Sequence, residues 1–227
     1  LNCERALKVK IETLISRQAF DEAKKLANDA MLIAKDPITF EIYRIRIEAR
    51  ENPANGLRMA TNLAHEHPDY PNVLNLLAQY QISLDQKQNA EKTLIRSLQL
   101  DKNNPETLLA LGALNRQNNS HETAQTYLKQ ALELNPSLIE AYLELGQSLQ
   151  DQRLNDQALQ VYNKAIEQVS KDPRPYVHAA NAYKASRDFR SAELMLKQAS
   201  QLAPSDQSIR RQLAAVVAQN LLDNLQE

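Results

Sequence analysis

The chain has 227 residues, enough for one domain with a sizeable core or for an array of smaller units. Its formal net charge is −1, and because a protein that neutralises many phosphates usually carries a basic excess, we expect no nucleic-acid partner. The three glycines are scattered, which argues against a phosphate-cradling loop and against an all-β chain rich in tight turns.

The first 70 residues predict four helices. Residues 5–16 and 20–35 carry apolar side chains at helical spacing, and Pro37 ends the second segment. Residues 38–47 are rich in β-branched side chains, which locally suggests a strand. A lone strand among helices would lack a pairing partner, so we predict a helix there. Residues 52–56 are expected to form a turn, and residues 57–67 a further helix that ends before Pro68.

From residue 71 onward the chain repeats itself. Each of the segments 71–104, 105–138, 139–172 and 173–206 predicts two amphipathic helices, and residues 207–227 predict one more. Two sets of small residues recur every 34 positions: Ala90, Ala124, Ala158 and Ala192, and Gly112, Gly146 and Ala180. A glycine in the middle of a helix costs about 1 kcal/mol relative to alanine. We therefore expect a neighbouring helix to cross closely at Gly112 and at Gly146.

These residues resemble the tetratricopeptide repeat family, whose period is about 34 residues. The family motif, Trp-x-x-Leu-Gly, has three consecutive counterparts: Leu108-x-x-Leu111-Gly112, Tyr142-x-x-Leu145-Gly146 and Tyr176-x-x-Ala179-Ala180. The match is strong over residues 71–206. It is weaker over residues 37–70, where Gly56 replaces the first alanine, and partial over residues 4–36, where the repeat is one residue short.

The resemblance implies an all-α fold, a right-handed superhelical array of antiparallel helix pairs that extends over residues 1–227 as a single unit. It implies about six repeats, over residues 4–36, 37–70, 71–104, 105–138, 139–172 and 173–206, and a capping helix over residues 207–227. It also implies that the first helices line a concave groove, where such proteins bind a peptide or a partner's helix.

Family geometry places a set of first-helix side chains in this groove. The expected peptide-binding residues are Asn72, Asn75, Gln79, Leu109, Ala113, Arg116, Leu143, Gln147, His178, Asn181 and Lys184. Amide side chains pair with both the N–H and the C=O of an extended chain, which favours backbone recognition. A solvated polar face without a ligand would have the same composition.

One family subtype grips the C-terminal carboxylate of chaperone tails with a set of Lys, Asn and Arg side chains. Windows that begin at Lys8 or at Asn75 place Glu12, Glu140 or Glu144 at positions of that set. Because a carboxylate repels a carboxylate, we expect no ligand of this carboxylate-clamp type.

The chain offers few groups for catalysis. His65 and His67 lie two residues apart and do not face each other on a helix, so they form a poor metal clamp. His121 falls in an expected turn without a sequence partner, and Cys3 has no nearby base. No Walker, HExxH or GxSxG motif is present. We expect no enzyme activity, no catalytic residue, no cofactor and no metal.

The leading functional hypothesis is a non-catalytic scaffold that binds a protein or peptide partner in the groove. The first residue is not Met, which suggests a processed chain or an excised fragment. The second hypothesis is therefore a repeat arm that presents substrates to a catalytic domain outside this chain. The third is self-assembly into homo-oligomers through the array ends, where Val217, Leu221 and Leu225 are expected to be exposed.

The compartment is suggested by two features. The lone cysteine, Cys3, cannot form an internal disulfide, which fits a reducing environment. No stretch approaches the roughly 20 apolar residues of a membrane helix, so we expect no membrane insertion. We expect a cytoplasmic protein, or a periplasmic or membrane-associated one if an upstream segment was removed.

Overall fold

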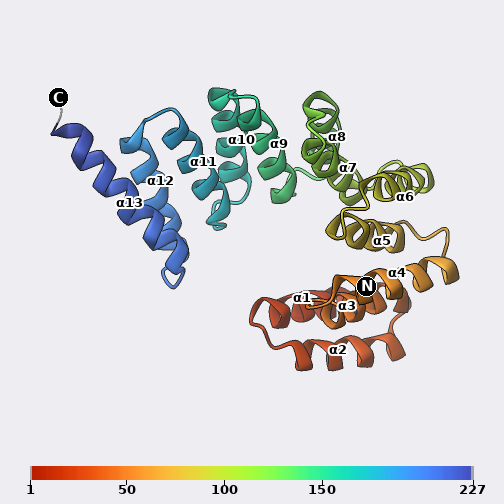
Figure 1. Cartoon of the computed structure of the whole chain (residues 1–227). Coiled ribbons are helices and arrows are strands. Elements are labelled where there is room, and N and C mark those ends of the chain that lie inside the picture. Colours follow the sequence, from red (N-terminus) through yellow and green to blue (C-terminus); the bar gives the residue numbers. More distant parts are fainter. Residues whose placement is uncertain (1, 226–227) are drawn as a thin grey trace. The chain divides into compact units, whose positions relative to one another are not determined.

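The computed structural model describes residues 2–225, within which the chain forms thirteen α-helices and no strand (Figure 1). The helices are α1 (Asn2–Ser16), α2 (Phe20–Ile33), α3 (Pro37–Glu48), α4 (Pro53–Glu66), α5 (Pro71–Ser83), α6 (Lys87–Leu100), α7 (Pro105–Gln117), α8 (His121–Leu134), α9 (Ile139–Asp151), α10 (Asn155–Gln168), α11 (Arg174–Ala185), α12 (Phe189–Leu202) and α13 (Gln207–Asn224). They form six sequential pairs and a final helix that packs on α12. The all-α prediction and the predicted helix over 38–47 are both confirmed.

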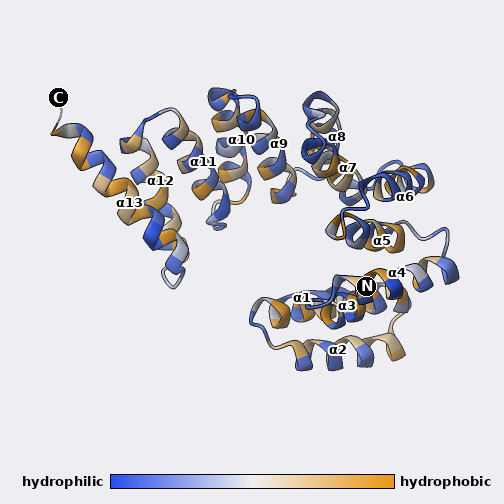
Figure 2. Cartoon of the chain, in the orientation of Figure 1, coloured by the Kyte–Doolittle hydropathy of each residue, from blue (hydrophilic) through white to orange (hydrophobic). Residues whose placement is uncertain are grey.

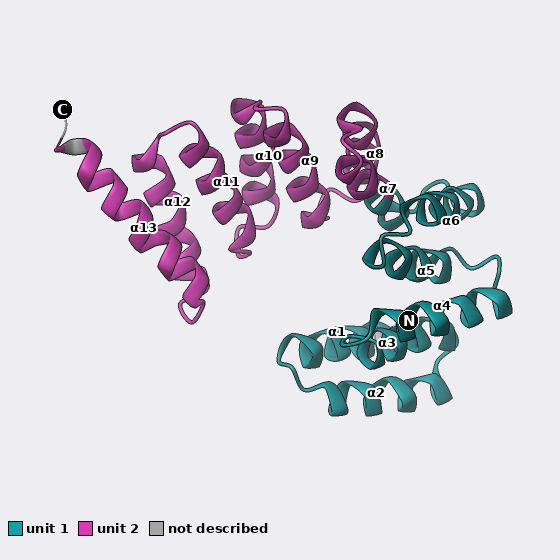
Figure 3. Ribbon diagram, viewed as in Figure 1, with its two compact units in different colours: residues 1–110 teal, residues 111–227 magenta. Residues whose placement is uncertain are grey.

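The chain divides into two compact units, residues 1–110 and residues 111–227 (Figure 3). The boundary falls inside α7. Each unit has its own hydrophobic clusters: one around Phe40 and another around Ile45 in unit 1, and one around Tyr162 and another around Leu196 in unit 2. Most helices carry both apolar and polar residues (Figure 2), as amphipathic packing requires. That residues 1–227 act as a single array stays a prediction.

Capping residues set the helix starts in the segment that departs most from the repeat. The Asp36 side chain accepts a hydrogen bond from the Thr39 amide at 3.4 Å, and Pro37 occupies the first position of α3. The helix α2 therefore ends at Ile33 rather than at residue 35, because Ala34 is already extended toward this cap.

The predicted turn over residues 52–56 is wrong. The helix α4 begins at Pro53, because the Asn52 side chain caps it by accepting a hydrogen bond from the Asn55 amide at 3.1 Å. Proline at the first helical position needs no hydrogen-bond partner, so Asn-Pro starts this helix where the sequence suggested a loop. Gly56 consequently lies inside α4.

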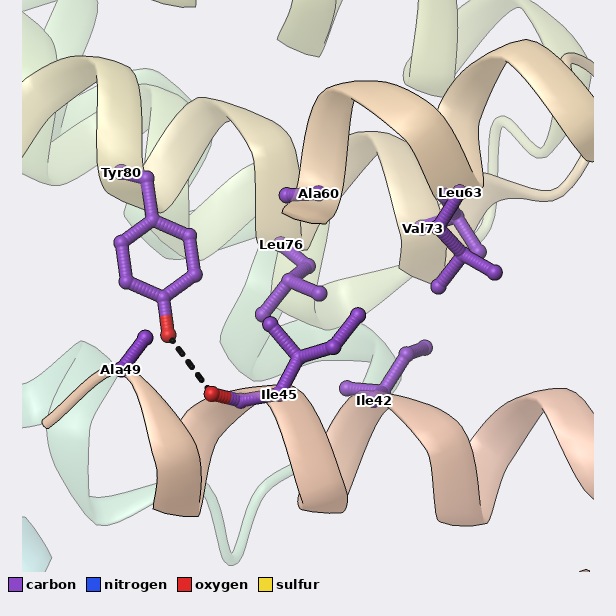
Figure 4. Close-up of a cluster of buried hydrophobic side chains, with 8 residues drawn as sticks. All are labelled: Ile42, Ile45, Ala49, Ala60, Leu63, Val73, Leu76 and Tyr80. Carbon is purple, nitrogen blue, oxygen red and sulfur yellow. Dashed lines mark hydrogen bonds between the residues drawn. The ribbon is translucent and has the colours of Figure 1, made fainter. Parts of the chain in front are cut away.

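Gly112 and Gly146 mark the close helix crossings that the sequence predicted, and Gly56 marks a third that it did not. A Cβ atom on Gly112 would lie 2.5 Å from Cγ of Leu128 in α8. A Cβ atom on Gly146 would overlap the ring of Tyr162, and one on Gly56 would overlap the ring of Tyr80. Figure 4 shows that Tyr80 points from α5 toward α3, where its hydroxyl donates to the Ile45 carbonyl oxygen at 3.4 Å.

The turn inside most helix pairs uses a residue in the left-handed region of backbone space. Five non-glycine residues have φ between 57° and 62°: Gln18, Asp85, Asn119, Arg153 and Arg187. The last four are spaced 34 residues apart. This conformation costs an L-residue roughly 1–2 kcal/mol, and it lets the chain reverse within a few residues. The pair α3–α4 uses the Asn52–Pro53 cap instead.

Candidate functional site

Three neighbouring pockets lie in unit 1. The first, the amide pocket, has a volume of about 390 Å³ and is bordered by residues from α1, α3, α5 and the start of α7, all first helices of their pairs. Its lining is Lys8, Glu12, Thr39, Ile42, Tyr43, Arg46, Asn72, Asn75, Asn104 and Glu106. Two of the predicted groove residues, Asn72 and Asn75, are thus brought together here.

The second pocket, the apolar pocket, has a volume of about 340 Å³ and is bordered by Glu12, Ile15, Ser16, Phe20, Tyr43, Arg46, Ile47 and Arg50. The third, the Gln79 pocket, has a volume of about 310 Å³ and lies between α3 and α5. Gln79, a predicted groove residue, lines it together with Arg46. Arg46 borders all three pockets, so this side chain is the common point of the surface.

Asn75 is held by a buried network as well as facing the amide pocket. Its Oδ1 accepts hydrogen bonds from Ser97 Oγ and from Thr107 Oγ1, each at 3.0 Å. Its Nδ2 is buried and has no hydrogen-bond partner among the described residues. Ser97 lies on α6 and Thr107 on α7, so this network joins α5, α6 and α7 within unit 1. Both hydroxyl side chains are fully buried. Asn72 and Gln79, by contrast, are exposed.

The charges around the amide pocket are unevenly paired. Neither Lys8 nor Arg46 forms an ion pair within residues 2–225. The Glu12 carboxylate accepts a hydrogen bond from the Tyr43 hydroxyl at 2.5 Å. Burial, together with this carboxylate, raises the pKa of Tyr43 above its ordinary range, so the phenol keeps its proton.

The polar groove residues predicted in unit 2 interact with other side chains of the same unit. Arg116 donates from Nε to Glu144 at 2.7 Å and from Nη1 to Asp151 at 3.1 Å. Nε2 of Gln147 lies 3.3 Å from Nδ1 of His178. Burial lowers the pKa of His178, which favours the neutral imidazole. Lys184 donates a long hydrogen bond of 3.5 Å to Asn181. These polar groups are therefore already satisfied in part by their neighbours.

The apolar centre predicted for the groove is only partly open. Leu143 is 9% exposed and belongs to the core cluster around Tyr162, so it offers little surface to a ligand. Leu109 in unit 1 and Ala113 in unit 2 are half-buried. The reason for this burial is geometric: Leu143 lies one residue after Tyr142 on a helix, α9, whose buried face is wider than the repeat pattern indicated. That Leu143 contacts a ligand stays a prediction.

The histidines and the cysteine show no catalytic arrangement among the described residues. No group of three or more metal-binding side chains is found in that part of the chain. His65 is exposed, and Cys3 is exposed on α1. His121 opens α8, and its Nδ1 lies 3.5 Å from Ser148 Oγ, a partner that the sequence did not reveal. No helix in the described range is long and apolar enough to cross a membrane.

Sequence reasoning missed Arg46, Tyr43 and Phe20. They lie in segments where the repeat is one residue short or irregular, so no inward register was assigned there. The sequence did not single out Arg46, because Glu41 and Arg44 also interrupt the apolar residues between Ile38 and Ile47, and all three charges mark solvent-facing positions of the helix.

Stacked helix pairs of about 34 residues, with pockets bordered by first helices, define a protein of the helical-repeat class. The chain contains tetratricopeptide repeats: residues 71–104 and 139–168 match one tetratricopeptide repeat model, and residues 105–148 match a second. The predicted family, about six repeats and the final helix are thereby confirmed. Proteins of this family generally mediate protein–protein interactions and are usually non-catalytic.

Solved structures share the fold. TTC0263, a thermophilic TPR protein of Thermus thermophilus, is 18% identical with a TM-score of 0.66, over 77% of this chain and 95% of that one. A chain of the APC/C hetero-tetramer Cut9–Hcn1 is 16% identical with a TM-score of 0.71, over 89% of this chain and 41% of that one. MamA of Desulfovibrio magneticus RS-1, from residue 41 to its end, is 19% identical with a TM-score of 0.55, over 66% and 85%. No curated protein matches the sequence.

Proposed function

We propose that this chain is a protein-interaction module that binds an extended segment of a protein partner on the first-helix side of unit 1. The observation that carries the proposal is the position of Arg46, which borders three pockets and has no ion-pair partner within residues 2–225. An exposed arginine at the junction of several pockets supplies up to five N–H donors to carbonyl or carboxylate oxygens. The chain itself is proposed to catalyse no reaction.

The side chains around Arg46 suit a peptide backbone. Asn72 and Gln79 are exposed amides, each with one acceptor and two donors. They lie two turns apart on α5, Asn72 at the amide pocket and Gln79 at the Gln79 pocket. Lys8 adds a second cation that carries no ion pair in the described range. In unit 2, by comparison, Arg116 forms ion pairs with Glu144 and Asp151. Arg174 likewise forms ion pairs with Glu140 and Asp172. This contrast favours unit 1 as the binding surface.

The test uses peptides selected against the full chain from a random displayed library, with peptides of about ten residues. Fluorescence anisotropy then compares the wild type with Arg46→Ala, Asn72→Ala and Gln79→Ala. We expect each substitution to weaken binding, Arg46→Ala by about tenfold, which corresponds to about 1.4 kcal/mol. Arg96→Ala is the matched control, because Arg96 lies on α6, a second helix, and lines none of the three pockets. Equal affinity for the wild type and Arg46→Ala would contradict the proposal.

Self-association of the chain through α13 is a second candidate function. Leu221 is 60% exposed and Leu225 83% exposed, while Val217 is half-buried against the rest of unit 2. Ala214, Ala218, Leu221 and Leu225 follow a 4-3-4 spacing, which is the seam of a helix that pairs with a second helix. Light scattering should show a dimer that Leu221→Lys dissociates; a monomer at high concentration removes this candidate.

A further inference from the structure

We infer that the apolar pocket of unit 1 receives one large apolar side chain of the bound segment, and that Arg46 and Arg50 select a segment with carboxylates beside that side chain. The inference rests on the proposed function and specifies the chemistry of its ligand. The occupant is therefore an extended peptide in which leucine or an aromatic residue is flanked by aspartate or glutamate.

The walls of the apolar pocket explain the preference for an apolar side chain. Ile15 from α1, Phe20 from the start of α2 and Ile47 from α3 form its apolar surface. Ile47 is 3% exposed, so it forms a fixed wall, whereas Ile15 and Phe20 are half-buried and remain partly open to solvent. A volume of about 340 Å³ accommodates one leucine or aromatic side chain. Covering this surface removes apolar area from water, at roughly 25 cal/mol per Å².

Arg50 is held beside this surface. Its guanidinium carbon lies 4.1 Å from the centroid of the Phe20 ring, and its Nη1 donates to the Ile47 carbonyl oxygen at 3.1 Å. Its ion pair with Glu51, at 3.2 Å, involves a carboxylate that is 82% exposed, and such surface pairs contribute little. The guanidinium therefore stays available to an incoming carboxylate, and its orientation is fixed in advance.

The charge at the border is positive. The lining contains two cationic side chains, Arg46 and Arg50, and one acidic side chain, Glu12. The Glu12 carboxylate already accepts a hydrogen bond from the Tyr43 hydroxyl. A carboxylate beside the apolar anchor would form charge-assisted hydrogen bonds with these two guanidinium groups. A lysine or arginine at the same place would meet like charges and be disfavoured.

The apolar pocket is continuous with the amide pocket. Both are bordered by Glu12, Tyr43 and Arg46. A chain whose side chain enters the apolar pocket therefore passes Arg46 and reaches Asn72 without leaving the surface. This continuity argues for a peptide that extends through both pockets, and against an isolated small molecule.

The test uses three peptides with amidated C-termini, each carrying the same uncharged fluorescent label, so that all negative charge comes from side chains. The first has the order Gly-Asp-Phe-Asp-Gly, the second replaces Phe by Gly, and the third replaces both Asp by Lys. Anisotropy titrations of the full chain should show binding of the first peptide at least about tenfold tighter than of either other. Ser16→Trp fills the pocket from its exposed border and should weaken the first peptide by about tenfold.

Two further variants separate the contributions. Arg46→Gln with Arg50→Gln should remove the discrimination between the first and third peptides, while Arg96→Gln leaves it unchanged; helical circular dichroism and thermal unfolding confirm that each variant folds. Equal binding of the three peptides, or no binding up to about 1 mM, overturns the inference. If library-selected peptides lose affinity with Arg46→Ala but not with Ser16→Trp, the anchor pocket is wrong while the proposed function stands.

Discussion

The hydroxyl of Tyr43 donates a hydrogen bond of 2.5 Å to Oε1 of Glu12, on the border that the amide pocket and the apolar pocket share. It joins α3 to α1 and gives the one acidic group at that border a donor from within the chain. Arg46 beside it is left without such a partner in the described range. Because the acid at this border has a hydrogen-bond partner and the arginine has none among the described residues, we propose that the border selects a ligand with carboxylates.

Tyr43→Phe should lower the free energy of unfolding by about 1 kcal/mol, because it removes this hydrogen bond without changing the ring that packs against α1. The same change should weaken acidic peptides, since Glu12 loses its donor and competes for Arg46. Urea denaturation measures the first effect and anisotropy the second. Tyr127→Phe is the control, because its hydroxyl has no hydrogen bond within residues 2–225. Identical unfolding curves for Tyr43→Phe and the wild type would refute the stabilising role.

Gly146→Ala should destabilise unit 2. Helix propensity alone would make alanine about 1 kcal/mol better than glycine in α9. The added Cβ would meet the ring of Tyr162, a fully buried side chain that cannot move aside, so we expect a net loss of about 1–3 kcal/mol. Thermal or urea unfolding measures the sign. A stabilised variant would show that α9 and α10 do not cross closely at this point.

Arg187→Gly should raise the free energy of unfolding by about 1 kcal/mol. Arg187 has φ of 61°, a conformation that an L-residue adopts at a cost and glycine adopts freely. Arg187→Ala serves as the control, because alanine removes the same side chain without relieving the backbone. If both variants have the same stability, the left-handed turn carries no strain.

The stability of the chain should depend on the protonation of His178 below about pH 6.5. Burial lowers the pKa of His178 below its ordinary value of 6.5, so the unfolded chain binds the proton more tightly than the folded one. The free energy of unfolding is therefore highest above pH 6.5 and falls as the pH decreases through the folded pKa. Burial raises the pKa values of the Asp36 and Asp172 carboxyls, but the hydrogen bonds that these carboxylates accept outweigh it, so both pKa values are lowered and both groups titrate at lower pH.

Thermal unfolding of His178→Gln as a function of pH tests this assignment. The variant should show a weaker decrease below about pH 6.5 than the wild type, since glutamine does not titrate. A parallel decrease in both proteins would assign the pH dependence to other groups.

The repeat pattern predicted the positions where helices of one repeat pack closely. Gly112 and Gly146 recur at the repeat period because α8 and α10 cross there, so the sequence contained their structural role. The start of α4 was not predictable from the pattern, because Asn52-Pro53 is equally typical of a loop and of a cap, and the choice depends on packing. Leu143 was assigned to the groove by register, yet the burial of its side chain depends on contacts from α10 and α11.

The candidate site was predictable in part. Asn72 and Asn75 line the amide pocket and Gln79 a neighbouring pocket, which is the surface where the register placed them. Their common neighbour Arg46 was missed because the 34-residue register fails over residues 37–70. The pairing of Arg116 with Glu144 and Asp151 was also missed, since it joins residues 28 and 35 positions apart. Such pairings decide which polar groups remain free for a ligand, and they require the folded chain.

The most direct test of the central claim is to map where a library-selected peptide lies on the full chain. A photo-crosslinking residue is placed at Gln79, at Ser16 or at Lys92, which are exposed on α5, α1 and α6 respectively. Mass spectrometry of the irradiated complexes should show crosslinked peptide from positions 79 and 16 and none above background from position 92. Crosslinks from position 92 alone would place the bound segment on the second helices and contradict binding around Arg46.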